Sequence, residues 1–418
     1  MTGVLEVFHR QRLAGTIREG ESGGMHFAYS PGWQSSPAAF PVSLSLPLTG
    51  TFSAAAGHNF FANLLPEGNA REQICRELRI SQGNDFGLLA ALGGDCAGAL
   101  TVVPAGTPPT SPHPPVCEPL TESELAAWST GASNALGFFS ERKRVRLSLA
   151  GAQHKLPVCI DGERIVLPRG EIPSTHILKF ASPAYSHLPE NEAFVSLLAR
   201  HVGLPAVEVR LLKTANRSIA LIERYDRQWV EGDCRRLHQE DFCQALGIPA
   251  SRKYEQEGGP GLRECFEVIQ RHCSYPLRDL RNLLRWALLN LLVGNADAHA
   301  KNLALLYDSE GKPGLAPFYD LVCTRNYRRV SRELAMSLGG TRDPDRFTER
   351  HLGSLAEVFG WRMAMVAGEL RQLSDTLEQQ LAMTVEVFRT SFGDSPMLER
   401  LPLIIRRQLR RVRSQLRF

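Results

Sequence analysis

The sequence predicts an α+β fold in which a strand-rich lobe precedes a mostly helical lobe, with a smaller α/β module ahead of both. Alternating and β-branched runs dominate from about residue 143 to 230, which favours strands. Apolar residues recur at helical spacing from Gln239 onward. Within this helical part, an apolar run that ends at Val293 leads into a polar loop that continues to Asn302.

The composition is that of an ordinary globular protein. Of the 418 residues, 43% are hydrophobic and 22% are charged, and the length predicts about two or three domains. A net charge of +4 is too small to indicate nucleic-acid binding. The sequence contains neither an apolar run of the roughly 18 residues that span a membrane nor an N-terminal export signal. The nine cysteines form no Cys-x-x-Cys pair, so we expect a reduced, cytoplasmic protein without disulfides or zinc.

The first module, residues 1–103, is expected to mix short strands and helices. The segment Ser43–Leu46 alternates polar and apolar residues, which predicts a strand that Pro47 ends. The other predicted elements of this module are strands at 4–8 and 25–29 and helices at 59–65 and 70–78.

Residues 104–119 contain seven prolines in sixteen residues and therefore predict a linker. The strand-rich lobe is expected at 120–230, with a capped helix that begins near Thr121 and a second helix at 190–202. Its predicted strands lie at 145–149, 157–160, 164–167, 176–180, 207–212 and 220–224.

Residues 231–418 are expected to form the helical lobe. Its long predicted helices lie at 261–272, 277–293, 351–381 (with breaks) and 403–416. The last of them has six arginines in the final thirteen residues, with apolar residues between them at helical spacing. This pattern predicts a packed helix with a solvated basic face, and contact with an anionic partner such as DNA is the alternative.

The polar loop has the residue spacing of a phosphotransferase site. Protein kinases use an Asp to orient the attacking hydroxyl, an Asn five residues later to hold Mg²⁺, and a separate downstream Asp to complete the metal site. Asp297 and Asn302 stand five apart, and Asp320 follows 18 residues after Asn302. We therefore expect Asp297 to act on the substrate hydroxyl and Asn302 and Asp320 to bind Mg²⁺. Lys301 is expected to neutralise phosphate charge, and His299 either to hold the loop or to act in the chemistry.

The strand-rich lobe contains candidate parts of an ATP site. Residues 148–155 read Ser-Leu-Ala-Gly-Ala-Gln-His-Lys, and such small residues let backbone N–H groups approach a phosphate, although an ordinary hairpin turn fits as well. Lys179 either pairs with ATP phosphates or is an exposed lysine of an edge strand. Glu223–Arg227 lies where kinase-like folds place the hinge that binds adenine, although an ordinary charged strand end fits this pattern as well. The residues expected to bind ATP are Ala150, Gly151, Ala152, Gln153, Lys155, Lys179, Glu223 and Tyr225.

Taken together, these motifs resemble the HipA toxin kinases of bacterial type II toxin–antitoxin pairs over nearly the whole chain. Besides the segments above, the resemblance rests on Leu44–Leu48 and Asn59–Pro66 in the first module. It also rests on two longer motifs, Arg236–Gln244 and Lys253–Gly261.

The resemblance implies a serine/threonine kinase that uses ATP and Mg²⁺ and has a two-lobed, protein-kinase-like fold related to lipid kinases. It implies that Ser148 is autophosphorylated and that this modification switches the kinase off, because about two negative charges would repel ATP. It also implies that Gln239 reaches the active site near Asp297. The implied target is an aminoacyl-tRNA synthetase, above all the glutamyl enzyme. The implied partner is a helix-turn-helix antitoxin dimer that binds operator DNA together with the toxin.

The chain departs from the family pattern at Ala298, His154, Tyr225 and the Arg-rich segment 324–333. One alternative function is a catalytically silent corepressor that acts with a helix-turn-helix antitoxin on operator DNA, although the full set of kinase residues argues against it. Another alternative is a small-molecule or lipid kinase on the same scaffold.

Overall fold

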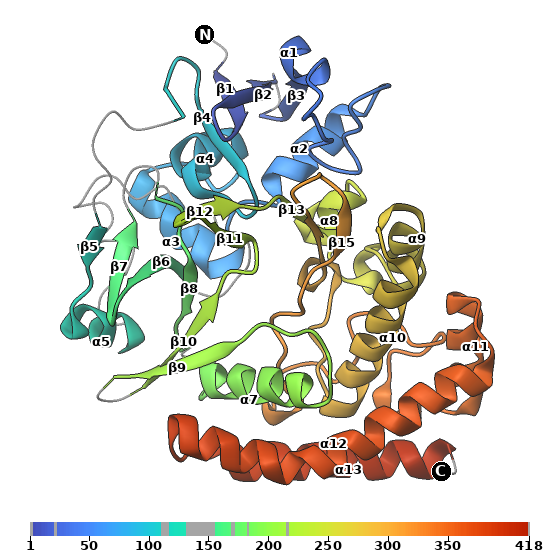
Figure 1. The fold of residues 1–418 in the computed structure, drawn as a ribbon. Coiled ribbons are helices and arrows are strands. Elements are labelled where there is room, and N and C mark those ends of the chain that lie inside the picture. Colours follow the sequence, from blue (N-terminus) through green and yellow to red (C-terminus); the bar gives the residue numbers. More distant parts are fainter. Residues whose placement is uncertain are drawn as a thin grey trace. The chain divides into compact units, whose positions relative to one another are not determined.

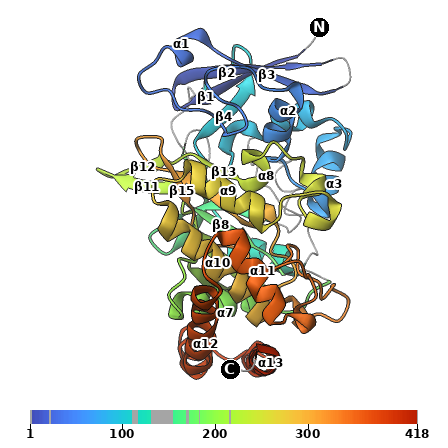
Figure 2. The same cartoon turned by 90° about the vertical axis from the view of Figure 1, so that its right-hand side faces the viewer.

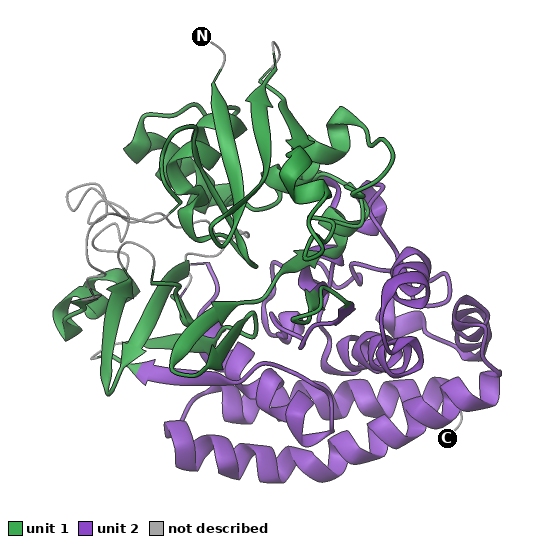
Figure 3. Ribbon diagram, turned by 45° about the horizontal axis from the view of Figure 1, so that its top comes forward, with its two compact units in different colours: residues 1–180, 213–251, 306–312 green, residues 181–212, 252–305, 313–418 purple. Residues whose placement is uncertain are grey.

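The computed structural model describes residues 3–20, 23–109, 117–130, 155–168, 172–181, 184–214 and 217–416. The chain divides into two compact units (Figure 3). Unit 1 comprises residues 1–180, 213–251 and 306–312, and unit 2 comprises residues 181–212, 252–305 and 313–418. Most strands belong to unit 1 and most long helices to unit 2, which confirms the predicted α+β class (Figure 1).

Unit 1 begins with a four-stranded antiparallel sheet whose strand order is β3-β2-β1-β4. Aromatic and aliphatic side chains of the sheet and of α2 form its core, including Phe27, Phe60 and Phe61. Helix α2 starts earlier than predicted because the Ser53 hydroxyl accepts a hydrogen bond from the Ala56 N–H and caps the helix. The elements are β1 (Val4–His9), β2 (Arg12–Glu19), β3 (Met25–Tyr29), β4 (Leu100–Pro104), α1 (Pro31–Gln34), α2 (Ala54–Ala62), α3 (Gly68–Leu78) and α4 (Asp85–Leu92).

A second sheet of unit 1 has the strand order β5-β7-β6-β8-β10. The strands of this lobe predicted within the described ranges are confirmed with small shifts at their ends, while the strand predicted at 145–149 lies outside those ranges. This sheet contains β5 (Cys117–Pro119), β6 (Lys155–Asp161), β7 (Arg164–Pro168), β8 (His176–Lys179) and β10 (Ser218–Glu223). The other elements of this part of unit 1 are α5 (Glu122–Thr130), the hairpin β11 (Arg227–Val230) and β12 (Asp233–Arg236), β13 (Gln239–Asp241) and α8 (Phe242–Ala245).

The prediction of a strand at Ser43–Leu46 is wrong. These residues form a tight turn that an isolated bridge between Ser43 and Leu46 closes. The turn forms because its polar groups have buried partners: the Leu44 N–H donates to Glu240 Oε1 at 3.1 Å, and the Ser45 hydroxyl donates to the Gln244 carbonyl at 2.7 Å. The serines therefore face the protein interior, where an exposed strand face would have turned them to solvent.

Glu240 is a buried carboxyl group that makes unit 1 sensitive to pH. It is 1% exposed and accepts hydrogen bonds from the hydroxyls of Ser43 and Tyr307 as well as from Leu44. Burial raises the pKa of Glu240 from 4.5 to about 7, although these hydrogen bonds and their donors favour the charged form. The folded protein therefore binds this proton more tightly than the unfolded chain does. Protonated Glu240 contributes its full stability below pH 4.5, and this contribution is lost as the pH rises to about 7.

Wild-type protein should therefore lose stability relative to a Glu240→Gln variant between about pH 5 and about pH 8, by on the order of 3 kcal/mol. The glutamine keeps the shape of the side chain and does not titrate. Urea unfolding of both proteins across this range gives the difference in unfolding free energy at each pH. Parallel pH profiles of the two proteins would show that Glu240 is already ionised in the folded state at the lower pH.

Unit 2 is built around α10, a helix whose residues are buried on almost every side from Leu283 to Val293. In Figure 2, as in Figure 1, α12 and α13 lie side by side. The predicted helix at 351–381 is two helices with a break at Gly360, where the backbone φ is +62°. The elements are α7 (Leu188–His201), α9 (Leu262–His272), α10 (Pro276–Val293), β14 (Ala304–Tyr307), β15 (Pro313–Leu315), α11 (Glu349–Phe359), α12 (Met363–Phe392) and α13 (Met397–Leu416); β9 (Val209–Lys213) and β14 each cross the boundary between the units.

Helix α13 confirms the prediction of a packed helix with a basic face. Ile405, Leu409 and Val412 are fully buried, whereas Arg406 and Arg407 are exposed. Its start lies six residues before the predicted one, and Pro402 is accommodated inside it. Among the helices of the described ranges, none is long and apolar enough to cross a membrane.

Candidate active site

The predicted site residues fall into three groups. Unit 1 contains Lys155, Lys179, Glu223, Tyr225 and Gln239, and unit 2 contains Asp297, His299, Lys301, Asn302 and Asp320. Ser148, Ala150, Gly151, Ala152 and Gln153 lie outside the described residues.

In unit 1, two lysines face each other across neighbouring strands. Lys155 on β6 is the register partner of Lys179 on β8, and the strands are antiparallel. Residues directly opposite on such strands share a face and have Cβ atoms about 5 Å apart, so two like charges there repel each other unless an anion lies nearby. Lys179 is 3% exposed, and β8 lies between β6 and β10, which rules out the alternative of an exposed edge-strand lysine. The register therefore places the two lysines predicted to bind ATP at adjacent positions on one face of the sheet.

The hinge segment follows β10. Glu223 is exposed and Tyr225 is half-buried, and the Tyr225 hydroxyl donates a hydrogen bond to Gln239 Oε1. Gln239 in turn donates from Nε2 to Asp226 Oδ2 at 3.2 Å. Gln239 thus lies against the hinge, and its predicted reach toward Asp297, a residue of the other unit, stays a prediction.

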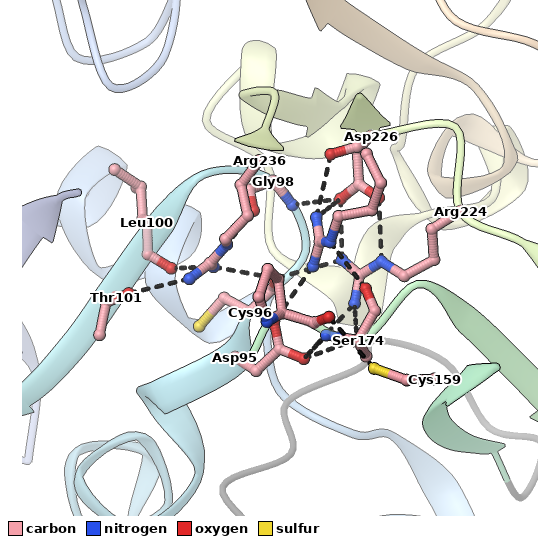
Figure 4. Close-up of polar contacts among 12 residues, drawn as sticks. Asp95, Cys96, Gly98, Leu100, Thr101, Cys159, Ser174, Arg224, Asp226 and Arg236 are labelled. Atoms are coloured by element: carbon pink, nitrogen blue, oxygen red, sulfur yellow. Dashed lines mark hydrogen bonds and ion pairs between the residues drawn. The ribbon is translucent and has the colours of Figure 1, made fainter. Parts of the chain in front are cut away.

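A buried network of charges surrounds the hinge (Figure 4). Arg224 binds Asp226 with two hydrogen bonds of 2.9 and 2.8 Å, and Arg227 lies 3.0 Å from the same carboxylate. Burial opposes ionisation of Asp226, but Arg224 and Arg227 hold its pKa below the usual range. The Ser174 hydroxyl donates to Asp95 at 2.6 Å and accepts from Arg224 at 2.8 Å. The sequence predicted the hinge here from position alone and contained no signal for the network, because contacts of Arg224 and Arg227 with Asp95 and Ser174, which are distant in the chain, leave no local pattern.

In unit 2, the polar loop begins where α10 ends. Gly294 caps the helix with φ +72°, and a Cβ at this position would lie 2.6 Å from Arg325 Cδ. The Asn295 side chain donates to Asn290 Oδ1 at 2.9 Å and accepts from the Asp297 N–H at 3.0 Å. These contacts connect the loop directly to the end of a buried helix, which restrains its backbone.

Hydrogen bonds to both the side chain and the backbone of Asp297 fix its orientation. Its Oδ1 accepts a hydrogen bond of 2.5 Å from the Tyr254 hydroxyl, and its backbone carbonyl accepts one of 2.8 Å from Asn302 Nδ2. Even so, the Asp297 side chain is 48% exposed. The carboxylate is therefore held in place but accessible to a substrate hydroxyl, which a general base requires.

The His299 ring is buried beside the Asp297 carboxylate without a hydrogen bond to it, although the His299 backbone N–H donates to the Asp297 carbonyl at 2.9 Å. Its Nε2 lies 3.9 Å from Asp297 Oδ1, and its ring packs edge-on against Tyr254 with centroids 5.0 Å apart. Burial lowers the pKa of His299 to about 3, and the charges of Lys253 and Lys301 add to this effect. The imidazole is therefore neutral near pH 7, which suits the predicted role of holding the loop better than the role of an acid.

The magnesium site predicted at Asn302 and Asp320 stays a prediction, and the two side chains have the chemistry that it requires. Because Asn302 Nδ2 donates to the Asp297 carbonyl, its amide oxygen is the atom left to meet a cation. Asp320 adopts a left-handed backbone with φ +54°, a conformation that is uncommon outside glycine and that clusters at functional sites. Within the described ranges, no group of three or more His, Cys, Asp or Glu side chains is placed to hold a metal. Amide and carboxylate oxygens are nevertheless the ligands Mg²⁺ prefers, and it takes further ligands from phosphates and water.

Two residues that support the loop had no predicted role. Tyr254, which holds Asp297, lies in the motif Lys253–Gly261, and that motif was the available signal for it. Thr324 accepts a hydrogen bond from the Ala296 N–H at 2.8 Å and donates to the Gly294 carbonyl at 3.0 Å. Its segment differed from the family pattern, so the sequence contained no signal for it.

Comparison with known proteins gives a consistent result. A model of the HipA-like C-terminal domain matches residues 147–385, and a model of the HipA N-terminal domain matches residues 5–103. The chain is 38% identical to the putative kinase Y4mE of Sinorhizobium fredii over 94% of each chain. It is 32% identical to the serine/threonine-protein kinase toxin HipA of Shewanella oneidensis, over 85% of this chain and 82% of the relative.

Among solved structures, the chain resembles Shewanella oneidensis MR-1 HipA in a complex with HipB and operator DNA. The TM-score is 0.85 at 28% identity, and the match covers 99% of this chain and 98% of the other. This likeness over essentially the whole length confirms the fold predicted from the sequence.

Proposed function

This chain belongs to the HipA family, and on that premise we propose that it is a toxin kinase that transfers the γ-phosphate of ATP to a serine or threonine hydroxyl of a protein. The observation that carries the proposal is the geometry of the polar loop. An accessible carboxylate, Asp297, is fixed by Tyr254 on one side and by Asn302 on the other. The spacing of Asp297, Asn302 and Asp320 is that of protein kinases.

ATP binding is assigned to unit 1. Lys155 and Lys179, paired across two strands, would neutralise phosphate charge. The backbone of Glu223 and Tyr225 would meet the adenine edge. Residues 150–153 would supply N–H groups to the phosphates.

The chemistry is assigned to unit 2. Asp297 orients the substrate hydroxyl and accepts its proton, while the Tyr254 hydroxyl keeps the carboxylate in place. Lys301 contributes positive charge, and neutral His299 packs against the Tyr254 ring and helps to hold the loop. Asn302 and Asp320 would hold Mg²⁺, which supplies charge neutralisation to the transferring phosphate.

The substrate and the control of this kinase follow from the family resemblance. We propose that it acts in the cytoplasm on an aminoacyl-tRNA synthetase, most specifically the glutamyl enzyme, and so arrests translation and growth. Autophosphorylation of Ser148 would inactivate it, because about two added negative charges would compete with the ATP phosphates. These proposals are supported by the kinship to a named toxin kinase.

A second role is favoured by the solved relative, whose complex contains HipB and operator DNA. We propose that this chain assembles with a helix-turn-helix antitoxin dimer and reaches operator DNA mainly through it. If this were its whole function, the chain would be a catalytically silent corepressor.

Expression followed by phosphoproteomics distinguishes the two roles. Cells that express the wild-type chain should stop growing and should accumulate one or a few new phosphoserine or phosphothreonine sites, with an aminoacyl-tRNA synthetase among the proteins modified. Cells that express Asp297→Asn should do neither. Equal growth and equal phosphopeptides in both cultures, with operator repression intact, would favour the corepressor.

A further inference from the structure

One arginine of the segment after the hinge binds a loop of the N-terminal module. Arg236, at the end of β12, donates hydrogen bonds to the Gly98 carbonyl at 3.0 Å and to the Thr101 hydroxyl at 2.9 Å. It also donates to the carbonyls of Cys96, at 3.3 Å, and Leu100. Figure 4 shows its guanidinium directed into this loop. A planar guanidinium group that donates to four acceptors of one short segment fixes the loop in one position.

Gly98 lies directly against the segment after the hinge. Its N–H donates to Asp226 Oδ2 at 2.7 Å. Its φ is +78°, and a Cβ built there would lie 2.9 Å from the Gln239 backbone nitrogen and 3.1 Å from the Gln239 carbonyl oxygen. The absence of a side chain at Gly98 is therefore what lets Gln239 occupy its present place.

The contacts continue from Gly98 to the hinge in two short steps. Asp226 Oδ2 accepts from Gly98 and also from Gln239 Nε2, and Gln239 Oε1 accepts from the Tyr225 hydroxyl. All of these residues belong to unit 1. A displacement of the loop would move the acceptor of Gln239 and, through Gln239, the tyrosine of the hinge.

We propose that residues 95–101 of the N-terminal module are a positioning element for nucleotide binding, which sets the hinge through Asp226 and Gln239. The inference rests on the proposed function, because it takes adenine as the ligand of the hinge. Gly98 and Arg236 touch no substrate in this account, and they act through Asp226, Gln239 and Tyr225. The N-terminal module is then part of the ATP site's support, in addition to any role in assembly.

The first test compares two glycines with the same backbone conformation. Gly98→Ala and Gly106→Ala both place a Cβ on a left-handed residue, with φ +78° and +79°, but only Gly98 has neighbours within 4 Å. The two variants therefore have the same backbone strain, but only Gly98→Ala adds a steric clash with Gln239. Gly98→Ala should raise the KM for ATP roughly tenfold with kcat nearly unchanged, whereas Gly106→Ala should leave both near wild type.

A second pair of variants tests the contacts of Arg236 without adding bulk. Arg236→Lys keeps the charge but cannot reproduce the planar guanidinium group, whereas Arg235→Lys makes the same change at the exposed neighbouring residue. We expect Arg236→Lys to raise the KM for ATP about fivefold and Arg235→Lys to have no effect. This pair decides the question if Gly98→Ala does not fold.

The split between KM and kcat separates positioning from stability. A variant that merely unfolds in part has fewer active molecules, so its apparent kcat falls while its KM is unchanged. Such a result for Gly98→Ala and Arg236→Lys, or equality of each with its control, overturns the inference while wild-type kinase activity leaves the proposed function standing. A wild-type protein that neither binds ATP by calorimetry nor transfers phosphate overturns both.

Discussion

An Asp297→Asn variant is expected to transfer phosphate on the order of a thousandfold more slowly than the wild-type protein. The amide removes the negative charge that orients the substrate hydroxyl and the group that accepts its proton. It keeps an oxygen at the position of Oδ1, so the hydrogen bond from Tyr254 is retained. Because Asp297 is half-exposed, the substitution should leave the folded structure intact. Initial rates at saturating ATP measure the effect.

Tyr254→Phe is the matched comparison for this prediction. It leaves the carboxylate and removes only the hydroxyl that holds it, so we expect a loss of about tenfold, well short of the loss in Asp297→Asn. Melting temperatures of both variants near that of the wild type would show that folding is unaffected. An Asp297→Asn protein that retained more than about a tenth of the wild-type rate would exclude Asp297 as the base.

An Asp226→Ala variant is expected to lose on the order of 3–5 kcal/mol of unfolding free energy. Asp226 is 2% exposed and is the shared acceptor of Arg224, Arg227, Gly98 and Gln239. Removing it leaves two guanidinium groups buried with fewer partners, and an uncompensated buried charge is far more costly than a missing contact. Urea unfolding monitored by tryptophan fluorescence gives the loss directly.

The control is Asp161→Ala, which removes the same side chain from an exposed ion pair. Asp161 and Arg164 lie 2.7 Å apart with side chains 58% and 68% exposed. Water solvates both charges in the variant, so the loss should stay below about 1 kcal/mol. If the two variants were equally stable, the buried network would contribute no more than a surface pair, and its role in fixing the hinge would lose its physical basis.

Local periodicity was sufficient to predict most of the long helices and the strands of the second sheet. The helix at Pro276–Val293 and the strand at His176–Lys179 follow from the spacing of their apolar residues, and the α+β class follows from their order along the chain. Asp297 and Asn302 were found because their spacing along one loop carries the signal, and the structure places them in hydrogen-bond contact.

The remainder depends on contacts between distant parts of the chain. Ser43–Leu46 alternates like a strand but forms a turn, because its partner Glu240 lies almost two hundred residues away. Tyr254 and Thr324 support the loop from separate segments, and neither has a spacing rule that connects it to Asp297. Likewise, the pairing of Lys155 with Lys179 required the strand register, which the sequence does not specify.

The central claim is that this chain transfers phosphate from ATP to a protein hydroxyl, and the most direct test follows that phosphate. Purified wild-type protein is incubated with ATP labelled at the γ-phosphate, Mg²⁺ and glutamyl-tRNA synthetase, with Asp297→Asn and a chelated sample in parallel. The account predicts acid-stable label on serine or threonine of the synthetase with wild type and Mg²⁺, and none in the other two samples. Absence of label from the synthetase, from the chain itself and from every protein of a bacterial lysate would contradict it.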